Sequence, residues 1–85
     1  MIIRTKFLGP TNFKGSRLKA TTPSGKHITI SWDYALNIDG NHRAAARACI
    51  EAHGEADDHG TYSCIWDEGG GALFFPMAHR NTFEL

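Results

Sequence analysis

The sequence predicts an α+β fold, an antiparallel sheet of about five strands packed on one α-helix, in the order β-β-β-α-β-β. Apolar and polar side chains alternate in five short segments, and this period of two is typical of half-buried strands. In one segment near the middle of the chain, apolar residues recur instead at three- and four-residue intervals, which indicates an amphipathic helix. A chain of 85 residues has room for one domain, residues 1–85, with a single modest core.

Three strands are predicted at the start of the chain, over residues 1–8, 16–22 and 26–32. The Gly-Pro-Thr-Asn sequence at 9–12 ends the first strand, and Pro-Ser-Gly at 23–25 forms a hairpin turn between the other two. Because the connections are short, we expect an antiparallel meander with one apolar and one basic face.

One helix is predicted over residues 42–53. Asn41 is a suitable N-cap, because its side chain can accept a hydrogen bond from an otherwise unpaired amide of the first turn, and Gly54 is a suitable stop. Small apolar residues at i, i+3, i+4 and i+7 form the expected buried stripe, which consists of Ala45, Ala48, Cys49 and Ala52. A stripe rich in alanine lets the helix lie close to the sheet.

Two more strands are predicted after the helix, over residues 61–66 and 72–77. The three glycines at 69–71 lie between strands and therefore lack the strand-to-helix setting of a phosphate-binding loop, so we expect a mobile hairpin tip. Residues 78–85 are predicted to form a tail that Phe83 and Leu85 hold against the body.

The charges are sorted along the chain. Residues 1–32 carry six basic side chains and no acid, whereas residues 48–85 carry seven acids and one base, Arg80. Such polarity is an argument about binding partners. If the first two strands pair, one sheet face collects four of the basic side chains: Arg4, Lys6, Arg17 and Lys19. We predict that these four residues bind a partner, either phosphates or an acidic protein surface; the alternative is a solvated strand face.

Two further arginines, Arg43 and Arg47, lie one helical turn apart and are also predicted partner-binding residues. Like charges at this spacing repel each other, and a partner would relieve the repulsion. Glu51, four residues beyond Arg47, offers an internal ion pair as the alternative. The acidic segment at 55–58 either imitates nucleic-acid phosphates or is ordinary loop polarity.

No catalytic or metal-binding signature stands out, so we expect a non-enzymatic protein without a cofactor. Four side chains have the donor atoms of a zinc site, namely Cys49, His53, His59 and Cys64. Their spacing, C-x3-H-x5-H-x4-C, is not a standard finger pattern, and we assign no metal ligands. Two cysteines are too few for a disulfide framework, and the charged start lacks the apolar stretch of a signal peptide. These features predict a cytoplasmic location without a membrane partner.

The first half of the chain resembles short uncharacterised proteins carried by phages and mobile elements of proteobacteria. The resemblance lies in four segments, at 5–12 (TKFLGPTN), 15–20 (GSRLKA), 34–37 (YALN) and 41–45 (NHRAA). It implies a phage accessory protein, and such proteins, which include anti-CRISPR and other anti-defence inhibitors, typically work by stoichiometric binding. No functional residues carry over from it.

Two hypotheses follow. The first is a small phage or mobile-element protein that binds and inhibits a host protein or ribonucleoprotein complex, such as a CRISPR–Cas or other defence nuclease. The alternative is a nucleic-acid-binding accessory protein that uses the basic sheet face. The predicted inward or loop positions of the aromatic residues weigh against the alternative, because single-stranded nucleic acid is bound by stacking bases on exposed aromatic rings.

Overall fold

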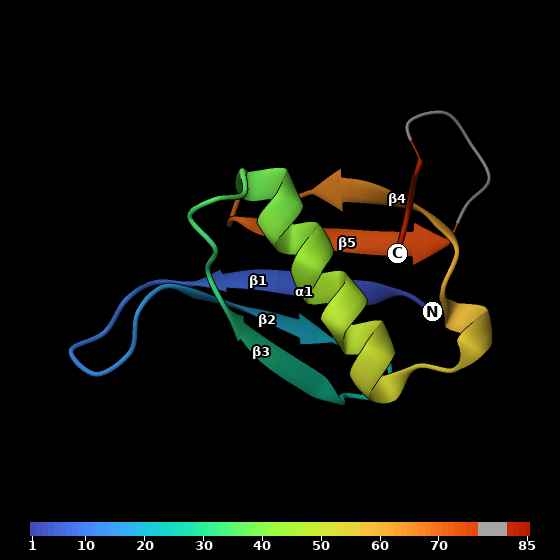
Figure 1. Ribbon diagram of the computed structural model, residues 1–85, viewed down its shortest axis with the longest axis horizontal. Helices are drawn as coiled ribbons and strands as arrows, with labels where there is room; N and C mark the ends of the chain where they lie inside the picture. Colours follow the sequence, from blue (N-terminus) through green and yellow to red (C-terminus); the bar gives the residue numbers. More distant parts are fainter. Residues whose placement is uncertain (77–81) are drawn as a thin grey trace.

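The computed structural model describes residues 1–76 and 82–85, and in these residues six strands form one antiparallel sheet (Figure 1). The strands are β1 (Ile3–Leu8), β2 (Arg17–Thr21), β3 (His27–Ser31), β4 (Thr61–Trp66), β5 (Gly71–Pro76) and β6 (Phe83–Glu84). They lie in the order β3-β2-β1-β5-β4-β6. One helix, α1 (Ile38–His53), lies across one face of the sheet (Figure 1). The predicted α+β class is confirmed.

The first three strands form the predicted meander. β1 pairs antiparallel with β2, and β2 with β3. Gly25, in the turn before β3, has a φ of 90°, a left-handed conformation that favours glycine. On its other side β1 pairs with β5, so the chain returns to the centre of the sheet after the helix. This crossover places the basic N-terminal strands beside the C-terminal ones.

The strand count is six rather than about five. The extra strand, β6, lies within the predicted tail and pairs with β4. Leu85 is buried, and its amide and carbonyl both bond to Gly60. Phe83 packs against the core, so the predicted anchoring of the tail by Phe83 and Leu85 is confirmed. Residues 77–81 of the predicted strand and tail lie outside the described residues.

The helix begins one turn earlier than the sequence analysis predicts. Its N-cap is Asn37, whose Oδ1 accepts a hydrogen bond from the amide of Gly40 at 2.7 Å. Asn41, predicted as the cap, is buried inside the helix. Its Oδ1 accepts from the amide of Asp33 at 2.7 Å, and its Nδ2 donates to the carbonyl of Leu36, among others. Asn41 therefore fixes the connection between β3 and α1 instead of capping the helix.

The buried stripe of α1 is rotated relative to the prediction. Ala45 and Cys49 are buried as expected, whereas Ala48 is half-buried and Ala52 is exposed. The observed stripe contains Asn41, His42, Ala45, Ala46, Cys49 and Ile50. It packs against apolar side chains from the sheet, chiefly Ile3, Leu18, Ala20, Ala72 and Phe74. The described part of the chain contains no helix that is long and apolar enough to cross a membrane.

Candidate partner-binding surface

Helix α1 covers one face of the sheet, and within residues 1–76 and 82–85 no helix or strand lies on the opposite face (Figure 1). We call the uncovered side the open face. Because successive side chains of a strand point to opposite faces, its members follow from the residues that α1 buries. The open face comprises Arg4, Lys6 and Leu8 of β1, Arg17, Lys19 and Thr21 of β2, His27, Thr29 and Ser31 of β3, Ser63 and Ile65 of β4, Leu73 and Phe75 of β5, and the neighbouring Ile2.

The four basic strand residues predicted to share a face do so. Lys6 lies directly opposite Lys19, and Arg17 lies opposite Leu8 on the same pair of strands. None of the four makes an ion pair with a described residue. Two like charges directly opposite each other destabilise a sheet, so the pairing of Lys6 with Lys19 has a cost that folding alone does not explain.

An apolar patch adjoins the basic half of the open face. Leu73 lies between Arg4 on β1 and Ile65 on β4, and Ile65 is 58% exposed. Phe75, two residues beyond Leu73, points to the same face, and Ile2 is 48% exposed. We call Ile2, Ile65, Leu73 and Phe75 the apolar patch. The position of Phe75 corrects the expectation that aromatic residues lie only on the inward face or in loops.

A shallow hollow of about 210 Å³ lies where the basic half meets the apolar patch. Its walls are Ile2 and Leu73 on one side and the turn at Thr22 and Pro23 on the other, and the Arg4 side chain lines it. A concave apolar surface next to a cation suits an apolar side chain with a carboxylate nearby.

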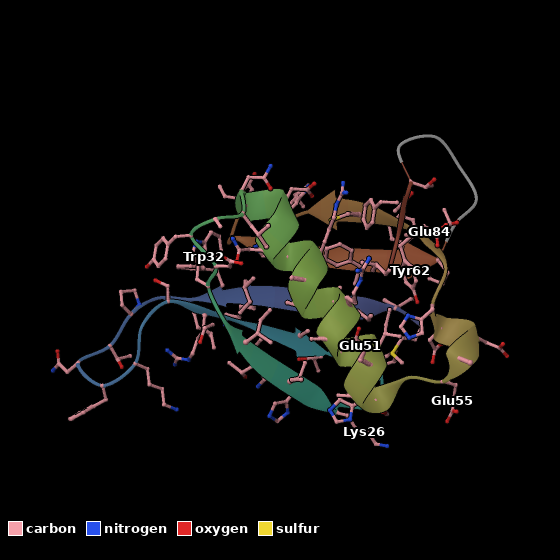
Figure 2. The ribbon with its side chains drawn as sticks, in the orientation of Figure 1. Lys26, Trp32, Glu51, Glu55, Tyr62 and Glu84 are labelled. Atoms are coloured by element: carbon pink, nitrogen blue, oxygen red, sulfur yellow. The ribbon has the colours of Figure 1, made fainter. Side chains whose placement is uncertain are left out.

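Arg43 and Arg47 do not join this surface. The guanidinium of Arg43 bonds to Asp39 at 2.8 Å and lies 3.8 Å from the ring centre of Phe83. Arg47 donates to the backbone carbonyl of Glu84 at 3.2 Å. Glu84 lies on β6, near the edge of the sheet (Figure 2). Both arginines therefore tie α1 to β6, and the alternative pair with Glu51 is not formed among the described residues.

Of the four potential zinc ligands, the two histidines bond to backbone carbonyls in different parts of the chain. His53 Nε2 lies 2.8 Å from the carbonyl of His27, and His59 Nδ1 lies 3.2 Å from that of Leu85. Burial raises the pKa of the Cys49 thiol, and burial together with Asp39 raises the pKa of Cys64 to about 11. Both thiols are therefore protonated at neutral pH, the form that neither attacks nor ligates well. The described residues contain no group of three or more such side chains able to hold a metal ion.

The acidic segment is partly structural. It forms a short 3-10 helix, η1 (Ala56–Asp58), and the Asp58 carboxylate accepts from the amide of Glu55 at 2.7 Å. The same carboxylate lies 3.1 Å from the ammonium of Met1. The Glu55 amide, and then the Met1 ammonium, lower the pKa of Asp58. Asp58 therefore closes a loop, while Asp57 remains exposed.

Comparisons of the chain with protein-family models, with curated proteins and with solved structures gave no match.

The apolar patch was not predicted from the sequence. Its signal was present, because Phe74 and Phe75 are consecutive in a predicted strand and must point to opposite faces. With one buried against α1, the other faces outward. The pairing of β1 with β5, which brings Leu73 beside Arg4, had no local signal, since the two residues are far apart in the sequence.

Proposed function

We propose that this protein works without catalysis, by binding an acidic protein surface through its open face. One observation carries the proposal: cations without described ion-pair partners, including Arg4 and Lys6, lie directly beside exposed apolar side chains. β1, β2 and β3 contain no acidic residue that could neutralise these cations. Complementary charge on a partner would do so, and would also speed the encounter.

The apolar patch favours a protein partner over a nucleic acid. Protein interfaces combine an apolar centre with a polar rim, which is the arrangement of Leu73 and Ile65 beside Arg4. Phosphate binding needs the cations alone, and it leaves the apolar side chains in water. Phe75 supplies one aromatic side chain, whereas a strand of stacked bases is usually held on several. The alternative of direct nucleic-acid binding is therefore the second choice.

The resemblance to phage and mobile-element proteins guides the choice of partner. It supports inhibition of a host macromolecular complex, and a CRISPR–Cas or other defence nuclease is the first to test. A small basic protein bound to an acidic surface of such a nuclease would block it by occupancy. On this proposal inhibition is stoichiometric and needs no turnover.

The experiment is affinity capture from a nuclease-treated bacterial lysate, with the captured proteins identified and quantified by mass spectrometry. The chain is compared with Lys6→Glu, which reverses a charge on the open face, and with Ile65→Ser, which removes an apolar contact. Lys14→Glu makes the same charge change in the exposed loop between β1 and β2, and it is the matched control.

We expect one stoichiometric protein partner that is retained by the chain and by Lys14→Glu but is lost with Lys6→Glu and Ile65→Ser. A partner that binds all four proteins equally would contradict the open face as the binding surface. A different result would favour the nucleic-acid alternative over a protein partner. In that case the chain recovers nucleic acid, the recovery disappears after nuclease treatment, and binding weakens steeply as the salt concentration rises.

A further inference from the structure

A second surface lies at the opposite side of the sheet from the open face, where α1 begins. A pocket of about 440 Å³ opens between the start of the helix and the ends of β1 and β3. Most of its wall is apolar and comes from Phe7, Trp32, Tyr34 and Ile38. Figure 2 shows Trp32 at this end of the sheet, near the start of α1. Pockets of this size and composition are typical of small-molecule sites.

The aromatic wall is held in a defined geometry. The rings of Phe7 and Trp32 meet edge to face, with their centres 5.3 Å apart and an interplanar angle of 89°. Both residues line the pocket, so a planar ligand there would pack against their rings. Tyr34 is 84% exposed and Ile38 is 63% exposed. Together they present a large apolar area to solvent that burial in the core does not explain.

One polar side chain lines this pocket from inside the protein. His42 is 2% exposed, and its Nδ1 lies 2.6 Å from the hydroxyl oxygen of Thr5. The ring also meets Trp66 edge to face, with centres 4.9 Å apart, so its orientation is fixed from two sides. The other nitrogen, Nε2, has no hydrogen-bond partner among the described residues. It is not one of the fully buried polar atoms that lack a partner, so it is not sealed inside the protein. It is the nitrogen left to face a ligand.

The pocket is suited to an uncharged molecule. Burial lowers the pKa of His42 against the opposing effects of Asp39 and Asp67, so the imidazole is neutral at neutral pH. The described residues that line it include no lysine, arginine, aspartate or glutamate. A charged ligand would lose its hydration without gaining a counter-ion, which is costly.

We propose that this pocket binds a small, uncharged, planar ring molecule that stacks against Trp32 and exchanges one hydrogen bond with His42 Nε2. The site is independent of the open face, because the two surfaces share no residue. A ligand of one or two fused rings fits the volume. His42 would orient it, as in other apolar pockets with few polar contacts. The pocket is also lined by Ser16 and Tyr34, whose hydroxyl groups are the other side-chain polar groups of its wall.

The experiment is a titration of the protein with three bicyclic probes of nearly equal shape. Binding is monitored through changes in the nitrogen–proton correlation NMR spectrum of the protein. Indole offers a hydrogen-bond donor, quinoline an acceptor, and indene neither. We expect saturable shifts around Trp32 and His42, with dissociation constants on the order of 1 mM for ligands this small. Either indole or quinoline should bind about tenfold more tightly than indene, since only one of them matches the proton on Nε2.

Three variants locate the site. Tyr34→Ala removes an exposed wall residue without a core contact, and it should weaken binding of the preferred probe severalfold. Phe13→Ala changes a side chain that is 96% exposed but does not line the pocket, so binding should be unchanged. His42→Phe, if it folds, should abolish the preference over indene.

Three results would overturn the proposal. The first is the absence of saturable shifts for all three probes. The second is equal binding of indole, quinoline and indene. The third is much tighter binding of N-acetyl-tryptophanamide than of indole, which would assign the pocket to a side chain of another protein rather than to a free small molecule.

Discussion

On the covered face of the sheet the buried side chain of Thr5 bonds to His42 of α1, whereas on the open face four cations lack ion-pair partners among the described residues. The two faces are built from the same strands, so this difference comes from alternate positions in one sequence. Phe74 and Phe75 show it most simply, since one is fully buried and its neighbour is partly exposed. The covered face accounts for folding, and the open face carries side chains that folding does not require.

The largest expected effect on stability is the difference between substitutions of these two phenylalanines. Phe74→Ala should lower the free energy of unfolding by about 3–5 kcal/mol, because it leaves a cavity in the core. This is a large share of the roughly 5–15 kcal/mol typical of a small domain. Phe75→Ala makes the same chemical change on the open face and should cost about 1 kcal/mol or less. Urea denaturation measures both, and equal losses would break the comparison between the faces.

The next effect concerns the connection that places α1 on the covered face. Asn41→Ala should cost about 2–3 kcal/mol, because it leaves the amide and carbonyl of Asp33 without their partner in a partly buried position. Asn37→Ala, at the N-cap, should cost only about 1 kcal/mol. The same denaturation experiment ranks the two. A larger loss of unfolding free energy for Asn37→Ala than for Asn41→Ala would mean that Asn41 contributes little to the position of α1.

A pH dependence tests the buried pair on the covered face. The pKa of His42 lies below its ordinary value of 6.5 in the folded protein. As the pH falls through 6.5, the unfolded chain takes up a proton on His42 and the folded chain resists, so the free energy of unfolding should decline there. His42→Phe should flatten this decline, whatever its own stability. An unchanged slope in that variant would mean that His42 does not cause the decline.

The smallest effect on stability belongs to the open face and has the opposite sign. Lys6→Glu replaces a repulsion with Lys19 by an attraction, which should stabilise the fold by about 0.5 kcal/mol. The melting temperature would then rise by about 2–4 °C for a domain of this size. Lys14→Glu should leave it unchanged. A lower melting temperature for Lys6→Glu would show that Lys6 supports the fold, and it would remove the reason for assigning it to a partner.

The strand meander could be predicted from the sequence because its signals are local. Alternation and the Pro-Ser-Gly turn lie within a few residues of each other, and the four basic residues of β1 and β2 share a face as a direct result. The start of α1 could not be predicted in the same way. Asp39 and Gly40 are poor helix formers, and the bonds that Asn41 makes to the preceding loop decide the boundary.

Features that depend on distant residues were also missed. β6 has two residues, too few for an alternation to be visible. The Thr5–His42 contact joins β1 to α1 across 37 positions in the sequence. The apolar patch needed both the position of Phe75 on the outward side and the crossover that brings β5 beside β1. Of the candidate surface, the sequence therefore predicted the basic half and not the apolar patch.

The central claim, that the open face is the binding surface, is tested most directly by side-chain footprinting. The chain is labelled with hydroxyl radicals alone and in complex with its captured partner, and modification is quantified residue by residue. The account predicts that Ile65, Leu73 and Phe75 lose reactivity in the complex, while Phe13 and Tyr34 react as in the free chain. Protection of Phe13 and Tyr34 with full reactivity at Ile65 would contradict it.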